Sequence, residues 1–276
     1  MTHSQTRLRF SKMHGLGNDF MVVDLSSLED VPALQRAETW RSLAHRRTGI
    51  GFDQALVILP PTHSLALARY RIFNADGSEV EQCGNGARCV AEWLRLHGRC
   101  TSDSIVHLQS EGGPVEARFV APGRVSVNMG EPRFPADPHR TLVVREQPVA
   151  FTVVSMGNPH IVIAVDDVDT AAIAALGPAL ETHPAFPQRT NVGFAQLIDR
   201  KHLKLRVHER GVGETQACGT GACAAVAVGR IAGELDTAVE VLLPGGALHI
   251  EWQGPGTSLW LTGEAVLSFD GEVAIF

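Results

Sequence analysis

The sequence has no run of basic residues, no apolar stretch long enough to cross a bilayer, and few cysteines. Its 30 acidic residues outnumber its 24 basic ones, which gives a formal net charge of −6. Nucleic-acid binding depends on lysine and arginine at the phosphates, so we expect no nucleic-acid partner. A membrane-spanning helix needs about 20 apolar residues in succession, so we expect no membrane partner either. Residues 1–10 lack the apolar segment of a secretory signal peptide.

Five cysteines in 276 residues are too few and too scattered for a disulfide framework. Reduced thiols are typical of the cytoplasm, and we expect the protein there. The two close pairs, Cys83 with Cys89 and Cys218 with Cys223, have no histidine at zinc-binding spacing, so we expect no metal site. The composition, 44% hydrophobic and 20% charged, is typical of a soluble globular chain with one large domain or two ordinary ones.

The chain contains an internal repeat. Residues 83–87 read CGNGA, and residues 218–222, which lie 135 positions later, read CGTGA. At the same offset Arg71 and Glu79 match Arg206 and Glu214. Further matches follow in the same order: Gly17-Asn18 with Gly157-Asn158, Gly51-Phe52-x-Gln54 with Gly193-Phe194-x-Gln196, Gly112-Gly113 with Gly245-Gly246, and Gly130-Glu131 with Gly263-Glu264. Several blocks in one order, at slowly drifting offsets, indicate a tandem duplication.

Each half is predicted to contain the same elements. Short β-branched runs are typical of strands, which we expect at 21–25, 55–59, 67–73, 161–165, 194–198 and 203–208. The first helix of each half is expected at 33–46 and at 171–180. A second helix, apolar on nearly all sides and therefore buried, is expected at 87–97 and at 222–231.

The predicted fold class is α+β, with two pseudo-symmetric domains, each a curved, mainly antiparallel sheet around a central helix. A proline-rich stretch from Pro132 to Pro148 marks the boundary between them. We place the domains at residues 1–135 and 136–276, and we leave the last strand free to pack with the first domain.

The repeated cysteines, Cys83 and Cys218, each precede a buried helix. The free N–H groups at a helix N-terminus favour both a thiolate and a bound carboxylate. Two thiols around one carboxylate site suit an amino-acid racemase or epimerase, in which one thiolate removes the α-proton and one thiol returns a proton. A single cysteine before a helix is more often a small core residue, but that reading does not explain two cysteines at equivalent positions. Cys89, Cys100 and Cys223 we interpret as structural.

The motifs along the whole chain, taken together, resemble those of the diaminopimelate epimerase family. They are residues 12–20 (KMHGLGNDF), 83–89 (CGNGARC), 156–160 (MGNPH), 190–192 (TNV), 209–215 (ERGVGET) and 217–222 (ACGTGA). The resemblance implies an enzyme that interconverts LL- and meso-diaminopimelate for lysine and peptidoglycan synthesis, without pyridoxal phosphate or another cofactor. It also implies two domains that close over the substrate, and a homodimer.

The resemblance also implies roles for individual residues. Cys83 and Cys218 correspond to the acid–base pair. The substrate-binding positions are Asn18, Gln54, Asn74, Gly84, Asn85, Asn158, Asn191, Glu209, Arg210, Gly219 and Thr220. His160 and Glu209 are candidates for tuning the two thiols, and Glu209 with Arg210 suits the second ammonium and carboxylate of the substrate. The chain departs from the family pattern at Phe269, where a tyrosine that contributes to the dimer often stands.

Three other functions remain open at this stage. A proline or hydroxyproline racemase would share the paired cysteines, but its substrates lack the distal charges that Glu209 and Arg210 would bind. A thiol redox protein would use Cys83 and Cys218 as a reversible disulfide, although the chain has no Cys-x-x-Cys motif. A binding protein without turnover accounts for a cleft and gives no reason for two thiols.

Overall fold

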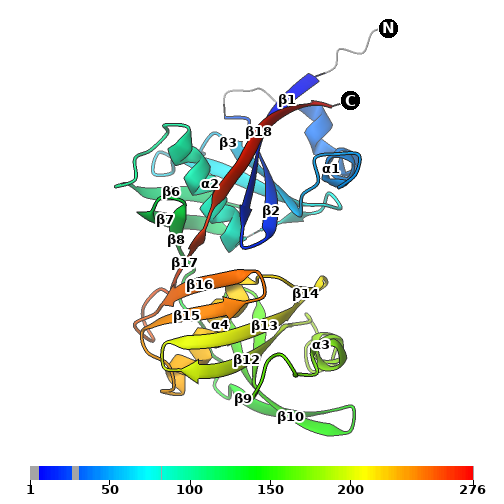
Figure 1. Cartoon of the computed structure of the whole chain (residues 1–276), viewed down its shortest axis with the longest axis vertical. Coiled ribbons are helices and arrows are strands. Elements are labelled where there is room, and N and C mark those ends of the chain that lie inside the picture. The colour runs from blue at the N-terminus through cyan, green and yellow to red at the C-terminus, as the bar shows by residue number, and fades with distance from the viewer. Residues whose placement is uncertain (1–5, 27–30, 82, 276) are drawn as a thin grey trace. The chain divides into compact units, whose positions relative to one another are not determined.

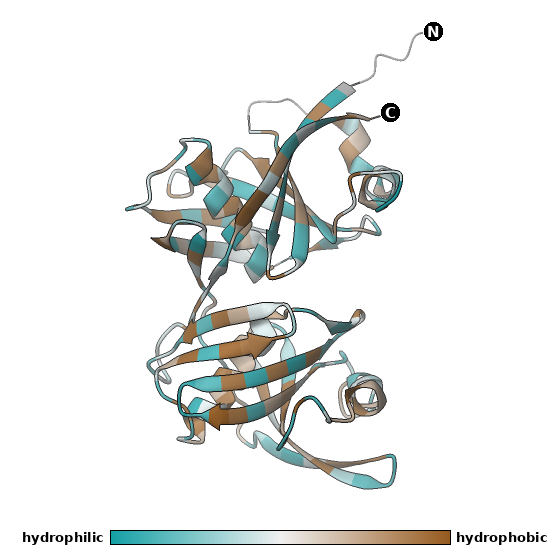
Figure 2. Ribbon diagram, in the orientation of Figure 1, coloured by the Kyte–Doolittle hydropathy of each residue, from teal (hydrophilic) through white to brown (hydrophobic). Residues whose placement is uncertain are grey.

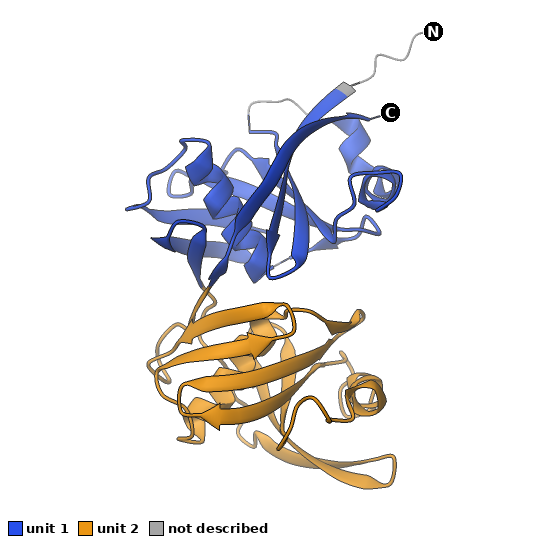
Figure 3. Ribbon diagram, in the orientation of Figure 1, with its two compact units in different colours: residues 1–127, 263–276 blue, residues 128–262 orange. Residues whose placement is uncertain are grey.

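The computed structural model of the chain describes residues 6–26, 31–81 and 83–275. The chain forms two compact units, residues 1–127 with 263–276 and residues 128–262 (Figure 3). Residues 128–135 therefore lie in unit 2 and the last strand lies in unit 1. The predicted limits of independent domains, 1–135 and 136–276, stay a prediction.

Both units are α+β. Unit 1 contains β1 (Thr6–Gly15), β2 (Asn18–Asp24), η1 (Pro32–Gln35), α1 (Ala37–Ala44), β3 (Gln54–Leu59), β4 (Ala68–Asn74), β5 (Glu79–Val80), α2 (Gly84–Leu96), β6 (Ile105–Ser110), β7 (Gly113–Ala121), β8 (Arg124–Asn128) and β18 (Val266–Ile275) (Figure 1). Unit 2 contains β9 (His139–Val144), β10 (Gln147–Ser155), β11 (Pro159–Ala164), α3 (Ile173–Glu181), β12 (Asn191–Asp199), β13 (His202–Glu209), β14 (Gly213–Thr215), α4 (Gly219–Ile231), β15 (Ala238–Leu243), β16 (Gly246–Glu251) and β17 (Trp260–Glu264).

Strand pairing confirms the internal repeat. In unit 1, β2 runs parallel to β3, β3 antiparallel to β4, and β4 parallel to β6. In unit 2, β11, β12, β13 and β15 are paired in the same way. Each parallel pair requires a crossover, and the helices lie in these crossovers at equivalent places. Helices α1 and α3 precede the second strand of each set, and α2 and α4 precede the fourth.

The long helix of each unit is central to its sheet. Helix α2 packs against β1, β2, β3, β7 and β18, and α4 packs against β10 to β13, β15 and β16. Nearly every residue from Gly221 to Gly229 is buried, as the all-round apolar pattern predicts. The predicted fold class, a curved sheet around a central helix in each of two repeats, is therefore confirmed. No helix in the described part of the chain combines the length and the apolar character needed to cross a membrane.

In unit 1 the shorter helix, α1, covers the face of β2 and β3 that is opposite to α2. Met21, Val23, Ala55 and Val57 join a buried cluster with Leu34 and Trp40, while Val22 and Leu56 between them are also buried. Strands buried on both faces are continuous apolar runs, as β2 and β3 are. Strands β13, β15 and β16 instead alternate for most of their length between buried and more exposed residues. The alternating hydrophobic and hydrophilic bands on these strands in Figure 2 agree with this pattern.

The helix expected at 33–46 is shorter and broken. The chain forms η1, becomes extended at Arg36 (φ −101°, ψ 129°), and begins α1 at Ala37. The indole Nε1 of Trp40 donates to the carbonyl of Leu34 at 3.0 Å, an acceptor that a continuous helix would use for its own backbone. The break therefore lets both side chains enter the core.

One block of the sequence repeat, Gly51-Phe52-x-Gln54 with Gly193-Phe194-x-Gln196, does not correspond in the structure. Phe20 pairs with Gln54, and the equivalent His160 pairs with Asn191. Gln54 is thus equivalent to Asn191, and not to Gln196. The matched glycines differ in kind, because Gly51 lies in a loop with a positive φ of 72° and Gly193 lies within β12.

Candidate active site

Cys83 and Cys218 are the N-cap residues of α2 and α4. Both have extended backbones, with φ −150° and ψ 111° at Cys83 and φ −116° and ψ 105° at Cys218. The Sγ of Cys83 accepts a hydrogen bond from the backbone N–H of Gly86 at 3.3 Å. The Cys218 side chain makes no such capping bond, although its Sγ would lie 3.2 Å from a Cβ on Gly221 in the first turn of α4. Both thiols are thus close to the first turn of a helix, whose free N–H groups stabilise negative charge. Gly84 and Gly219 begin the two helices, and their N–H groups are among these donors.

The second glycine of each Cys-Gly-x-Gly motif lets the helix start against the sheet. A Cβ on Gly86 would lie 2.9 Å from Cδ2 of Leu56 on β3. A Cβ on Gly221 would lie 2.9 Å from Cγ2 of Val207 on β13 and 3.2 Å from Sγ of Cys218. Only glycine permits this approach without displacement of the neighbours.

The surroundings of the two thiols differ. Cys83 is half-buried, whereas Cys218 is 4% exposed. Burial first, and the negative charge of Glu209 second, raise the pKa of Cys218 well above its ordinary value. Burial also raises the pKa of Glu209, although hydrogen bonds from Thr215 and Cys218 oppose the shift. Cys218 is therefore a protonated thiol near neutral pH, in contact with Glu209.

A repeated ion pair fixes the hairpin that precedes each cysteine. Arg71 on β4 binds Glu79 on β5 through two hydrogen bonds of 2.7 Å. Arg206 on β13 binds Glu214 on β14 in the same way, at 2.6 and 3.0 Å. These pairs are the residues that the 135-residue offset matched in the sequence. The bidentate geometry gives each hairpin one defined arrangement just before its thiol.

The predicted amide residues of unit 1 form two hydrogen-bonded pairs. Gln54 Nε2 donates to Asn74 Oδ1 at 2.9 Å, across the β3–β4 ladder. Asn85, in the first turn of α2, donates from Nδ2 to Asn18 Oδ1 at 3.2 Å. Asn18 follows a two-residue hairpin loop, Leu16-Gly17, in which both residues have positive φ. The structure thus brings Asn18 to the helix end that carries Cys83.

The corresponding residues of unit 2 lead to the thiol of Cys218. The Nε2 of His160 lies 3.0 Å from Asn158 Oδ1, and Asn158 Nδ2 donates to Thr220 Oγ1 at 3.4 Å. That hydroxyl lies 3.7 Å from Cys218 Sγ. Burial, followed by the positive charge of Arg210, lowers the pKa of His160 to about 3. The imidazole is therefore neutral, and it donates its Nε2–H to Asn158.

Asn191 and Arg210 are held mainly by backbone groups. Asn191 donates from Nδ2 to the carbonyl of Pro159 at 2.9 Å and accepts from the N–H of Arg210 at 3.0 Å. The guanidinium of Arg210 donates to the carbonyl of Gln188 at 3.1 Å. The two bonds of Asn191, on β12, thus link the β13–β14 hairpin to β11. The bond from Arg210 to Gln188 ties the hairpin to the loop after α3. Arg210 retains N–H groups beyond this bond that can bind a carboxylate.

Sequence reasoning missed several polar residues next to these side chains. Arg88 is fully buried and donates to Asn85, and Asp53 accepts from Asn18. Glu181 and His208 form a buried pair at 2.9 Å, and the N–H of Gly211 donates to the same carboxylate at 2.8 Å. Arg88 lies within the CGNGARC motif, which was the available signal. The other three have no local pattern, because their partners are distant in sequence.

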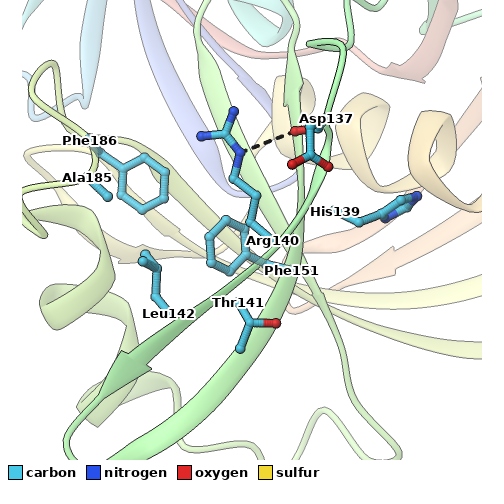
Figure 4. A pocket seen from close by; sticks show the side chains of 8 residues that line it. All are labelled: Asp137, His139, Arg140, Thr141, Leu142, Phe151, Ala185 and Phe186. Carbon is cyan, nitrogen blue, oxygen red and sulfur yellow. Dashed lines mark hydrogen bonds between the residues drawn. The ribbon is translucent and has the colours of Figure 1, made fainter.

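A cavity of about 360 Å³ lies elsewhere in unit 2, along the β9–β10 hairpin (Figure 4). Phe151 and Phe186 contribute rings to its wall, and Arg140 Nε donates to the carbonyl of Asp137 at 3.2 Å. None of the predicted site residues lines this cavity. Within the described ranges, no group of three or more His, Cys, Asp or Glu side chains is arranged to hold a metal ion.

The chain is similar to known proteins over nearly its whole length. The family model for diaminopimelate epimerase matches residues 10–135 and 152–268. A diaminopimelate epimerase from Ectopseudomonas mendocina (strain ymp) is 50% identical over 278 residues, which cover 97% of this chain and 99% of the relative.

Two solved structures are similar in fold. A hydroxyproline epimerase from Agrobacterium vitis has a TM-score of 0.73 at 17% identity and covers 97% of this chain and 92% of its own. A PhzF-family phenazine biosynthesis protein from Bacillus anthracis has a TM-score of 0.70 at 16% identity and covers 98% of this chain and 100% of its own. At these identities the similarity is one of fold alone.

The duplicated fold, with a thiol at the start of each central helix, and the similarity to the E. mendocina enzyme make this protein an isomerase. The chain belongs to the diaminopimelate epimerase family.

Proposed function

We propose that this protein interconverts LL- and meso-diaminopimelate by proton transfer at the α-carbon between Cys83 and Cys218, with no cofactor. The reaction belongs to lysine and peptidoglycan precursor synthesis. One observation carries the proposal: each repeat has a cysteine at the N-cap of its central buried helix, Cys83 on α2 and Cys218 on α4. Family membership supplies the substrate, through the 50% identical relative.

In the proposed reaction the α-carboxylate of the substrate binds at the helix N-termini. Backbone N–H groups of Gly84 and Asn85, and of Gly219 and Thr220, are the donors there. Their partial positive charge also stabilises the negative charge that moves into the carboxylate when the α-proton leaves.

The proton transfer leaves the pair of cysteines with one thiol and one thiolate, as before the reaction. A thiolate removes the α-proton, so that the C–H bond breaks and an S–H bond forms. The second thiol then protonates the opposite face of the carbon, and its S–H bond breaks. The raised pKa of Cys218 favours the thiol in the free enzyme, so Cys218 is the proton donor of the resting protein and Cys83 is the base. The reverse reaction exchanges these roles.

Glu209 and Arg210 have separate functions in this proposal. The carboxylate of Glu209 contacts Cys218 and accepts from the hydroxyl of Thr215, which suits control of the thiol proton. Arg210 has unused N–H groups for the distal carboxylate of the substrate. Asn18, Gln54, Asn74, Asn158 and Asn191 contribute amides around the site.

We also propose a cytoplasmic homodimer. All five cysteines are free thiols, as expected of a protein in a reducing compartment. In unit 1, β18 is paired with β1, and Phe269 on β18 is 51% exposed while its ring packs edge-on against Phe10. An exposed aromatic ring on the last strand suits an apolar contact with a second copy, without the hydroxyl of a tyrosine.

The proposal is tested by replacing each thiol singly. Cys83→Ser and Cys218→Ser are each expected to lower epimerisation of LL-diaminopimelate by at least about 100-fold, because a general acid or base is lost. Cys100→Ser is the matched control, since Cys100 lies outside both motifs, and it should retain full activity. Near-normal turnover by either of the first two variants removes that cysteine from the mechanism.

A further inference from the structure

Unit 1 contains a chain of hydrogen bonds that passes through two predicted substrate-binding amides. Arg88 Nη2 donates to Asn85 Oδ1 at 2.9 Å. Asn85 Nδ2 donates to Asn18 Oδ1 at 3.2 Å, and Asn18 Nδ2 donates to Asp53 Oδ2 at 3.0 Å. The four residues come from α2, the start of β2 and the loop before β3.

The two end residues of this hydrogen-bond chain, Arg88 and Asp53, can each make only one kind of hydrogen bond. A guanidinium can only donate hydrogen bonds, and a carboxylate can only accept them. An asparagine amide between them can present either its oxygen or its nitrogen to a neighbour. With Arg88 at one end and Asp53 at the other, only one orientation of both amides satisfies every contact.

Both ends are themselves fixed. Arg88 is 0% exposed, and its Nε donates to the carbonyl of Glu264 at 3.2 Å. A Cβ on Gly15 would lie 3.2 Å from Arg88 Nη2 and 2.9 Å from that carbonyl, so the glycine leaves room for the guanidinium. Asp53 also accepts from the N–H of Asp19 at 3.1 Å and from Arg46 at 2.7 Å.

We propose that Arg88 and Asp53 are positioning residues, which hold the amides of Asn18 and Asn85 with their NH2 groups available to the substrate carboxylate. The inference rests on the proposed function. In this orientation each amide has two N–H groups, of which one donates within the hydrogen-bond chain and the other is available to the substrate. In the reversed orientation each amide would present its oxygen, which repels a carboxylate. The two residues thus set substrate affinity without touching the substrate.

The two-ended arrangement predicts how variants combine. Arg88→Met alone leaves Asp53 to hold both amides, and Asp53→Ala alone leaves Arg88 to hold them. Each single change is expected to raise KM for LL-diaminopimelate by less than about fivefold, the scale of one hydrogen bond. In the double variant both amides can rotate together, and KM should rise at least about tenfold beyond the product of the single effects. The kcat should change much less, because ground-state binding is what is lost.

Two matched controls separate orientation from charge and packing. Arg88→Lys keeps a donor-only group, so Arg88→Lys with Asp53→Ala should behave like Asp53→Ala alone. Arg46→Gln removes the ion pair to Asp53 but leaves the carboxylate, and its side chain is 60% exposed. Arg46→Gln with Arg88→Met should therefore show only the product of its single effects. Thermal midpoints of all variants identify any that fail to fold.

The inference is overturned if the folded Arg88→Met, Asp53→Ala double variant raises KM by no more than the product of the single effects. If the wild type does not epimerise LL-diaminopimelate, the proposed function is rejected instead. The orientation of the Asn85 amide is then determined by a measurement that needs no substrate. Neutron diffraction of the deuterated wild type should show the deuterons of Asn85 Nδ2 on the side of Asn18. Deuterons on the side of Arg88 overturn the inference in either case.

Discussion

His160 is a buried residue whose protonation state depends on the fold. It is 1% exposed, and burial and the charge of Arg210 lower its pKa to about 3 from the ordinary 6.5. Between these two values the unfolded chain binds one more proton at this residue than the folded chain does. The free energy of unfolding therefore falls as the pH decreases through this range, by about 1.4 kcal/mol per pH unit.

His160→Gln should remove this part of the acid sensitivity. Glutamine keeps an N–H for Asn158 but does not take up a proton. Urea unfolding of both proteins at pH 7, 5.5 and 4.5 measures the difference in slope. His139→Gln is the control, because His139 is exposed and bonded only to Thr152 Oγ1 among the contacts described. Equal pH slopes for wild type and His160→Gln contradict a neutral buried imidazole.

At the residue scale, local motifs revealed the thiols but not their supporting side chains. Cys83 and Cys218 could be predicted because each stands in a five-residue motif that occurs twice. Asp53 could not, because its contact with Asn18 joins residues 35 positions apart. The contact between Asn85 and Asn18 spans 67 positions. Such partners are defined by strand pairing and helix placement, which a short motif does not contain.

The starts of α2 and α4 differ in how tightly they meet the sheet. On Gly221 an added Cβ would collide with the branched side chain of Val207 and lie 3.2 Å from Sγ of Cys218. On Gly86 it would meet the terminal Cδ2 of the more flexible Leu56 and stay 3.6 Å from Sγ of Cys83. An alanine at position 221 would therefore displace the thiol of Cys218, whereas an alanine at position 86 would leave the thiol of Cys83 in place.

Gly221→Ala should therefore be the more damaging of two matched changes. We expect it to lower the free energy of unfolding by about 1–3 kcal/mol, the usual range for overpacking. Its kcat/KM should fall roughly tenfold, which corresponds to about 1.4 kcal/mol of lost transition-state stabilisation. Gly86→Ala should lose less than about threefold in kcat/KM. Urea unfolding and initial rates measure both, and the opposite ranking would falsify the account of these helix starts.

At the element scale, the buried central helices and the paired strands were predictable, while loops and registers were not. The all-round apolar pattern of 222–231 leads directly to a buried α4. The helix expected at 33–46 is broken at Arg36, where Leu34 and Trp40 enter a core cluster with residues distant in sequence, and a local helical pattern does not contain that packing. Loops of different length precede β3 and β12, and the glycine match across them therefore gave the wrong register.

The order of strands in unit 2 is a circular permutation of the order in unit 1. In unit 1, β18 pairs with β1, and in unit 2, β9 pairs with β10 as a hairpin. Unit 2 begins at Asn128, the last residue of β8, and unit 1 resumes at Gly263, within β17. Both places are close to the matched Gly130-Glu131 and Gly263-Glu264. The chain ends of unit 1 thus correspond to the β9–β10 turn of unit 2. This explains why the last strand belongs with the first half of the chain.

A circular permutant should therefore fold and keep its activity. Thr6 pairs with Ile275, so a short glycine–serine linker can join the old termini. The new termini belong between Arg145 and Glu146, exposed residues with φ of 50° and 65°. Both lie in the left-handed region, so opening the turn there relieves strain. We expect kcat/KM for LL-diaminopimelate within about threefold of wild type, measured together with the thermal midpoint.

A second permutant serves as the comparison. Opening the chain between Gln216 and Ala217 cuts the segment that carries Cys218 from the hairpin held by Arg206 and Glu214. This protein should lose nearly all turnover. If both permutants are equally active, or both are unfolded, the cyclic relation does not describe how the chain is held together.

The most direct test of the two-thiol mechanism is proton exchange in D2O. The purified, reduced protein is incubated with LL-diaminopimelate, and the α-protons are followed by NMR at low conversion. With two separate thiols, the meso product should carry deuterium at the inverted carbon from the start, while the remaining LL substrate keeps its protium. Protium retained at the inverted carbon of the product, or deuterium entering the LL substrate as fast as product forms, would contradict transfer between Cys83 and Cys218.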